Sequence, residues 1–170
     1  MVTLTHIADT HLGHRQYGLK QREDDMVSTT RAAFREMVNE RDSEAILLPG
    51  DLFHCRDLRP KVLDQVEREL SRVPDDVPVL VSRGNHDENL TPREVTWLNY
   101  LHRRGQIVFL RANLDADSDT AHFEPYDSED PGNHAGFYDI EVAEFDGPVR
   151  VFGLQWRGAR TEQALSQVAH

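Results

Sequence analysis

The stretch LLPGDLFHCRD, residues 47–57, joins an apolar run to a Gly-Asp pair, and a histidine follows the aspartate by three residues. The apolar run within 44–50 is short and bounded by turn-forming residues, which predicts a buried strand. A carboxylate and an imidazole at the end of such a strand indicate a polar site. A single pair of this kind fits an ordinary turn equally well, so the rest of the chain decides its meaning.

The same pattern follows two other predicted strands, 2–8 and 77–83. The polar residues after the three strands are Asp9, His11, Asp51, His54, Asn85, His86 and Asp87. In open α/β sheets, ligands bind beyond the carboxyl ends of the strands, so these side chains are expected at one rim. Each motif alone would fit a turn or a helix cap. Three in succession favour a shared metal site, and oxygen donors mixed with imidazole suit Mn, Fe or Zn better than Ca.

Strands and helices alternate over the first two thirds of the chain. Apolar periodicity predicts helices at 23–42 and 59–73. A third helix is expected within 91–105, where Thr91 is the N-cap and Glu94 completes a capping box. This alternation is typical of a largely parallel sheet flanked by helices.

The pattern changes after a fourth predicted strand at 106–110. Residues 113–136 are acidic and rich in turn-forming residues, which predicts an irregular surface excursion. Two strand-like runs within 137–156 surround an Asp-Gly pair at 146–147, a hairpin signal. The segment 159–170 begins a helix. The expected fold class is α/β, with a mainly parallel sheet, flanking helices and a C-terminal hairpin.

Composition limits the class of protein. At 170 residues the chain suits one domain with a sizeable core. It carries 30 acidic against 19 basic residues, a net charge of −11, which argues against a general nucleic-acid coat but leaves room for a local basic groove. Abundant Asp with only two lysines resembles proteins of salt-loving organisms, although an ordinary acidic protein fits too. A lone cysteine, no membrane-length apolar stretch and no signal peptide predict a cytoplasmic protein.

The motifs resemble a known family. D-x-H at Asp9, G-D at Asp51 and G-N-H-D at 84–87 are similar to the first three motifs of the calcineurin-like metallophosphoesterases. HIADTHLGHRQY (6–17) and GDLFH (50–54) narrow the resemblance to the archaeal double-strand-break repair nuclease of the meiotic-recombination-eleven type, whose bacterial relative is SbcD. The resemblance covers nearly the whole chain and is weakest over the acidic excursion.

This resemblance implies a metallophosphoesterase-type sandwich with a two-metal site that hydrolyses DNA phosphodiesters, as a 3′-5′ exonuclease and single-strand endonuclease. The implied cation is Mn²⁺, with Mg²⁺, Fe²⁺ or Zn²⁺ as alternatives. Asp9 and His11 would hold the first metal, Asp51 would bridge both metals, and Asn85 would hold the second. The implied partners are DNA, a second copy of the chain, and a coiled-coil ABC ATPase of the Rad-fifty type; no membrane is implied.

The resemblance also implies roles toward the substrate. His86 would stabilise charge or protonate the leaving oxygen, and His54 would help to place the phosphate. Arginines near the motif loops are candidate phosphate contacts, with ordinary surface charge as the alternative interpretation. The arginines concerned include Arg15, Arg56 and Arg83.

The chain departs from the family pattern downstream. Family members supply three more histidines, two of them in G-H-x-H, and this chain has no G-H-x-H. Its downstream histidines are interpreted as bystanders: His102, His122, His134 and His170. We therefore expect residues 1–170 to be the N-terminal part of a single nuclease domain, with the second half of the fold missing.

Two alternatives stay open. One is another metallophosphoesterase, acting on phosphomonoesters or cyclic nucleotides. The other is a non-catalytic module for dimerisation or partner binding. Leu98, Tyr100 and Leu101 are candidates for a dimer surface by resemblance.

Overall fold

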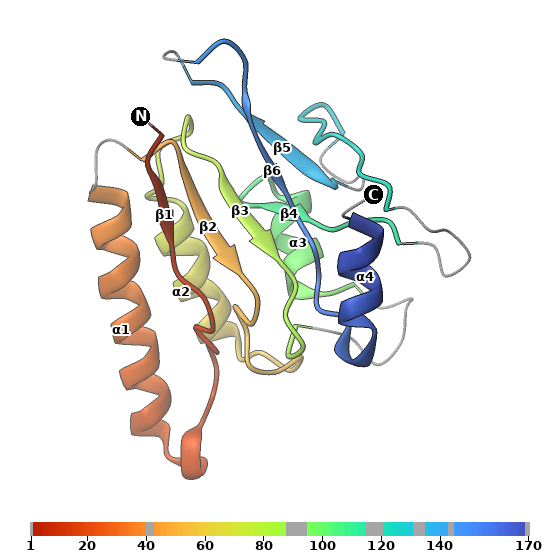
Figure 1. Ribbon diagram of the computed structural model, residues 1–170. Coiled ribbons are helices and arrows are strands. Elements are labelled where there is room, and N and C mark those ends of the chain that lie inside the picture. The colour runs from red at the N-terminus through yellow and green to blue at the C-terminus, as the bar shows by residue number, and fades with distance from the viewer. Residues whose placement is uncertain are drawn as a thin grey trace.

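The centre of the fold is a parallel sheet of four strands that lie side by side in chain order (Figure 1). The computed structural model describes residues 2–39, 43–87, 95–114, 121–130, 135–142 and 145–168. The strands are β1 (Leu4–His6), β2 (Ala45–Pro49), β3 (Val79–Ser82) and β4 (Val108–Leu110). All four predicted strands are confirmed, each somewhat shorter than the apolar run that predicted it.

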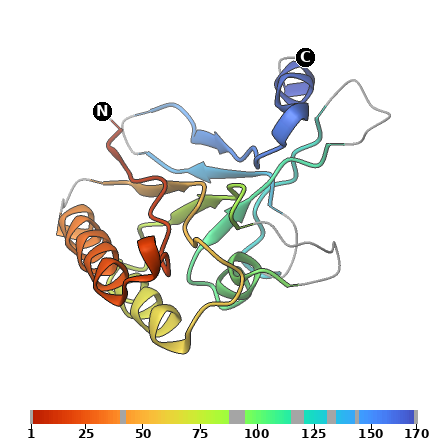
Figure 2. The same cartoon turned by 90° about the horizontal axis from the view of Figure 1, so that it is seen from below.

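Three helices cover one face of this sheet (Figure 2). They are α1 (Lys20–Asn39), α2 (Pro60–Leu70) and α3 (Trp97–Arg103). Their apolar faces and the sheet share one core, in which Phe34, Val66 and Leu98 pack with Ile46 and Val81. The two helices that apolar periodicity predicted therefore bury apolar residues against the sheet, as expected. The first begins three residues earlier than expected, and the second begins at its proline, as a proline at the first helical position favours.

The start of α3 differs from the sequence prediction. Thr91 and Glu94 lie outside the described residues, but Thr96 has an extended backbone (φ −77°, ψ 163°), so the observed helix begins at Trp97. Thr96 is the N-cap: its hydroxyl oxygen accepts the Asn99 N–H (3.1 Å), and Asn99 Oδ1 accepts the Thr96 N–H (3.3 Å). The expected single helix across 91–105 is therefore wrong, because this second capping box starts the helix later.

The proposed dimer surface on α3 is also corrected. Leu98 and Leu101 are fully buried in the core beneath the helix. They are not available to a second copy of the chain. Tyr100 is only partly buried, and its hydroxyl lies 3.4 Å from the Glu67 carboxylate of α2.

The opposite face of the sheet is covered by a hairpin. Strands β5 (Phe137–Ile140) and β6 (Val149–Phe152) pair antiparallel, as the Asp-Gly signal predicted. Ile140 packs with Leu80 and Val108 of the sheet in a second core. The hairpin thus makes the fold a sandwich of helices, parallel sheet and antiparallel hairpin (Figure 2).

The remaining described segments are short helices and irregular chain. They comprise the 3-10 turns η1 (Gln16–Gly18) and η2 (Gly158–Arg160), and the helix α4 (Thr161–Val168). Residues 121–130 contain neither helix nor strand, which agrees with the expected excursion. Among the helices described, none combines the length and the apolar character needed to cross a membrane.

Candidate metal centre

The loop after β1, which carries Asp9 and His11, is the first motif loop, and the loop after β2, which carries Asp51 and His54, is the second. These two loops run side by side beyond the carboxyl ends of their strands. The Asp9 N–H donates to the Gly50 carbonyl (3.3 Å), and the His11 N–H donates to the Asp51 carbonyl (2.9 Å). The Gly50 N–H in turn donates to the Ser82 carbonyl at the end of β3 (3.0 Å). Parallel pairing therefore continues past the sheet and fixes the first two motif loops against each other.

Three motif residues have left-handed backbone conformations. The φ angles are 53° at Asp9, 43° at His11 and 49° at Asp51, and the described part of the chain has one other non-glycine residue of this kind, Tyr17. Such conformations are rare for residues with a side chain and cost about 1–3 kcal/mol each. They persist where the surrounding structure enforces them, and they cluster at functional sites.

The left-handed turns bring a set of metal-ligating atoms together. Asp9, His11 and Asp51 each offer one ligand atom, and these atoms lie within 4.8 Å of one another. His11 Nε2 is 3.9 Å from Asp51 Oδ2, and Asp51 is buried. Two carboxylates with one imidazole suit a divalent first-row cation.

The loop after β3, which carries Asn85 and His86, is the third motif loop. It is joined through Asp51 to the group of possible metal ligands. Asp51 Oδ1 accepts the His86 N–H (2.8 Å). The adjacent Asn85 is exposed in the same loop, so it remains a predicted ligand.

Asp87, the last residue of the third motif, is buried and links two loops, a role that its place in the sequence did not predict. Its Oδ1 accepts the Phe53 N–H (3.0 Å), and its Oδ2 accepts the Gly84 N–H (3.1 Å). Burial raises the pKa of the Asp87 carboxyl, and the two N–H donors oppose that shift. The carboxylate thus ties the second motif loop to the third.

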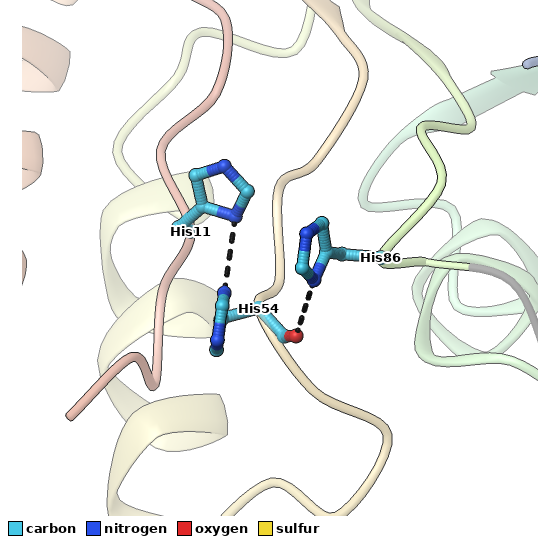
Figure 3. Close-up of side chains that lie close together, drawn as sticks. All are labelled: His11, His54 and His86. Atoms are coloured by element: carbon cyan, nitrogen blue, oxygen red, sulfur yellow. Dashed lines mark hydrogen bonds between the residues drawn. The ribbon is translucent and has the colours of Figure 1, made fainter. Parts of the chain in front are cut away.

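Three histidines, one from each motif loop, lie close together (Figure 3), and one of them, His11, also belongs to the group with the two carboxylates. His54 Nδ1 lies 3.3 Å from His11 Nδ1, within hydrogen-bond distance. His86 Nδ1 lies 3.0 Å from the His54 carbonyl oxygen, to which only a protonated Nδ1 can donate. The predicted phosphate-facing pair, His54 and His86, is therefore next to the predicted ligand His11.

A fourth imidazole, His14, was not predicted to belong to the site. Its ring stacks on that of His54, with centroids 3.8 Å apart and planes at 20°. Desolvation, followed by the nearby imidazoles of His14, His86 and His11, lowers the pKa of His54, while the Asp51 carboxylate opposes this. The position of His14, three residues after His11, puts it in the same loop but does not by itself predict this contact.

The arginine of the first motif loop is already paired. Arg15 Nε donates to Glu23 Oε2 (2.9 Å), and Arg59 at the start of α2 binds the other oxygen of the same carboxylate. Glu23 is only 4% exposed. Arg15 therefore holds the loop to α1, and a phosphate would have to compete with Glu23 for it.

The other two candidate arginines lie in the second and third loops. The backbone carbonyl of Arg56 accepts the Trp97 indole N–H (2.6 Å), and its side chain is exposed. The backbone carbonyl of Arg83 accepts the Trp156 N–H (2.9 Å), which places it beside the segment after β6. Both remain predicted phosphate contacts.

Two of the downstream histidines can be placed. His102 is buried where α3 meets β4, and its Nδ1 accepts the Phe109 N–H (3.2 Å). His122 is exposed in a bridge with Asn113. His134 and His170 lie outside the described residues.

Comparison with known proteins identifies relatives. The sequence pattern of the calcineurin-like phosphoesterases matches residues 2–163. The DNA double-strand break repair protein Mre11 of Halobacterium salinarum is 30% identical over 72% of this chain and 31% of that protein. Its namesake in Sulfolobus acidocaldarius is 34% identical over 54% of this chain and 24% of that protein. The chain thus spans about a quarter to a third of the length of these curated relatives. The crystal structure of Pseudomonas putida nuclease MPE matches 54% of this chain and 42% of that chain, at 30% identity and a TM-score of 0.40.

Proposed function

The chain belongs to the calcineurin-like phosphoesterase family, and we propose that residues 1–170 are the N-terminal part of a nuclease domain that hydrolyses DNA phosphodiesters at a two-metal centre. The observation that carries the proposal is the approach of Asp9, His11 and Asp51, whose ligand atoms lie within 4.8 Å of one another. The similarity to relatives named for double-strand break repair supports DNA as the substrate.

The donor set fits the cations that we propose. Asp9, His11 and Asp51 would hold the first cation, and Asp51 with Asn85 would contribute to the second. Carboxylate and amide oxygens with one imidazole suit Mn²⁺, the cation we favour. When bound, divalent cations supply Lewis-acid stabilisation of the charge on the phosphoryl oxygens.

We assign the leaving oxygen to His86. When its Nδ1–H donates to the His54 carbonyl, at the observed 3.0 Å, the ring can gain or lose a proton only at Nε2. A proton held at Nε2 can then pass to the oxygen that departs from phosphorus. His54, stacked against His86 with centroids 4.6 Å apart, would orient the phosphate.

The proposed partners rest on the similarity to the double-strand break repair relatives. DNA phosphates would lie along the rim that carries Arg56 and Arg83. A phosphate at Arg15 would have to compete with Glu23, which already binds its guanidinium. A coiled-coil ABC ATPase of the Rad-fifty type and a second copy of the chain are the proposed protein partners.

The substrate class is tested by comparing three substrates. The purified chain is incubated with Mn²⁺ and a labelled DNA duplex, a phosphomonoester or a cyclic nucleotide. We expect chelator-sensitive hydrolysis, even where slow, to favour DNA and to disappear in His86→Ala. Preferred hydrolysis of either small substrate would assign the site to a different metallophosphoesterase activity.

A further inference from the structure

We propose that His11, His54 and His86 form a distinct three-imidazole site that binds one borderline transition cation, such as Zn²⁺. This site goes beyond the proposed nuclease centre, because it uses a different ligand set and needs no catalytic activity. It shares one residue, His11, with the carboxylate-containing group.

The spacing of the three rings fits such a cation. One nitrogen from each ring lies within 4.8 Å of the other two. Tetrahedral zinc with Zn–N bonds of about 2.0–2.1 Å has ligand nitrogens roughly 3.3 Å apart. His11 Nδ1 and His54 Nδ1 are already 3.3 Å apart, which is the separation that two such ligands need.

The orientation of His86 is also that of a metal ligand. Its Nδ1 lies 3.0 Å from the His54 carbonyl, so donation by Nδ1–H leaves the lone pair of a neutral ring on Nε2. Figure 3 shows this second nitrogen on the side of the ring that faces His11. A backbone acceptor on the far nitrogen is the usual outer contact of a ligating histidine, since it fixes the tautomer and the ring.

His54 is restrained in a similar way. The ring of His14 stacks on one face of it at 3.8 Å, and the ring of His86 stacks at 4.6 Å. The ring is therefore held between two others with its Nδ1 directed at His11. A site that is held in place before binding loses less entropy when the cation arrives.

The ligand chemistry separates this site from its neighbour. Three neutral imidazoles suit Zn²⁺, Cu²⁺ or Ni²⁺, whereas carboxylates favour Mn²⁺ and Mg²⁺. His11 would serve the carboxylate group through Nε2, which lies 3.9 Å from Asp51, and the imidazole group through Nδ1. Zn²⁺ would thus draw His11 away from Asp51 and would engage the two histidines proposed to serve the phosphate.

The test measures metal binding without activity. Purified chain and its variants are titrated with Zn²⁺ and with Mn²⁺ by calorimetry, and Co²⁺ absorption reports the coordination. His54→Ala should weaken Zn²⁺ binding by at least about tenfold and leave Mn²⁺ binding within about twofold. Asp9→Ala should weaken Mn²⁺ binding by at least about tenfold and leave Zn²⁺ binding within about twofold. His6→Ala, which removes an exposed imidazole on β1, is the matched control and should change neither.

The outcomes distinguish the two sites. Loss of Zn²⁺ binding in Asp9→Ala but not in His54→Ala would overturn the three-imidazole site, as would an unmodified chain that binds no Zn²⁺. An unmodified chain that binds Zn²⁺ but no Mn²⁺ would count against the nuclease centre and not against the three-imidazole site. His86→Gln, with circular dichroism to confirm folding, repeats the Zn²⁺ test if His54→Ala does not fold.

Discussion

Gly84 and Asp51 are packed so closely that not even a methyl group fits between them. A Cβ on Gly84 would lie 2.0 Å from Asp51 Oδ1 and 2.3 Å from the Asp51 backbone nitrogen. This contact holds the third motif loop against the proposed bridging ligand. Glycine at position 84 is therefore a requirement of the site itself, and not only of the turn.

Gly84→Ala should displace the Asp51 carboxylate. We expect a loss of about 1–3 kcal/mol in the free energy of unfolding, because the added methyl overpacks a closed contact. Mn²⁺ affinity should fall as well. Gly105→Ala is the control: a Cβ there meets nothing within 4 Å, so only the cost of its positive φ remains. Equal Mn²⁺ affinity in the two variants, measured by calorimetry, would contradict this explanation.

In a complete version of the domain, with the downstream ligands supplied, Asp51→Ala and His86→Ala should separate metal binding from proton transfer. Asp51 is the ligand that the two proposed metals share, so its loss should abolish both Mn²⁺ binding and cleavage. His86→Ala should bind Mn²⁺ within about twofold of the unmodified chain, yet lose cleavage. Calorimetry and a labelled-duplex assay measure the two properties. Cleavage at the normal rate by His86→Ala would rule out its role as the acid.

Residues 1–170 alone should bind at most about one Mn²⁺ tightly and show little nuclease activity. Asp9, His11 and Asp51 would supply three ligands for one cation, whereas Asp51 and Asn85 would supply two for the other. The less complete position should fill only at high Mn²⁺ concentration. Two tight sites in a calorimetric titration, with rapid duplex cleavage, would mean that other residues complete the centre.

Asp87→Asn should destabilise the motif loops despite its similar shape. Both carboxylate oxygens accept buried backbone N–H groups, from Phe53 and Gly84. An amide offers one acceptor and one donor, so one N–H would be left without a partner, at a cost of about 1–3 kcal/mol. Denaturant unfolding measures the loss. A variant as stable as the unmodified chain would show that these two hydrogen bonds are dispensable.

Glu23→Gln should weaken the contacts of α1 with the first motif loop and with the start of α2. It removes the charge that pairs with Arg15 and Arg59, and we expect a loss of about 1–2 kcal/mol in the free energy of unfolding. The matched control is Asp64→Asn, whose pair with Arg68 is exposed and should cost less than about 1 kcal/mol. Thermal unfolding of the two variants side by side measures both losses of stability. Equal losses would show that burial of Glu23 does not strengthen its ion pairs.

The sequence could predict which segments meet at the site, because each motif follows an apolar run and parallel strands share one carboxyl edge. It could not predict the left-handed backbone at Asp9, His11 and Asp51, since any of these residue types is compatible with ordinary turns. The stacking of His14 on His54 depends on how two loops approach each other, which local spacing does not encode.

The errors on α3 have a similar origin. Thr91 and Thr96 each begin a plausible capping box, and only the extended backbone at Thr96 decides between them. Leu98 and Leu101 lie on an apolar helical face, and such a face packs equally well against a core or a second chain. Only the packing of α3 in the folded chain shows that this face is buried in the core, and periodicity does not predict that packing.

The order of the strands in the sheet has a consequence for synthesis. Because β1 to β4 lie side by side in the order in which they are translated, each new strand can add to an edge that already exists. No strand has to wait for a later one to be inserted between it and its neighbour. A chain that leaves the ribosome from its N-terminus can therefore bring its ligand loops together one after another, in step with translation.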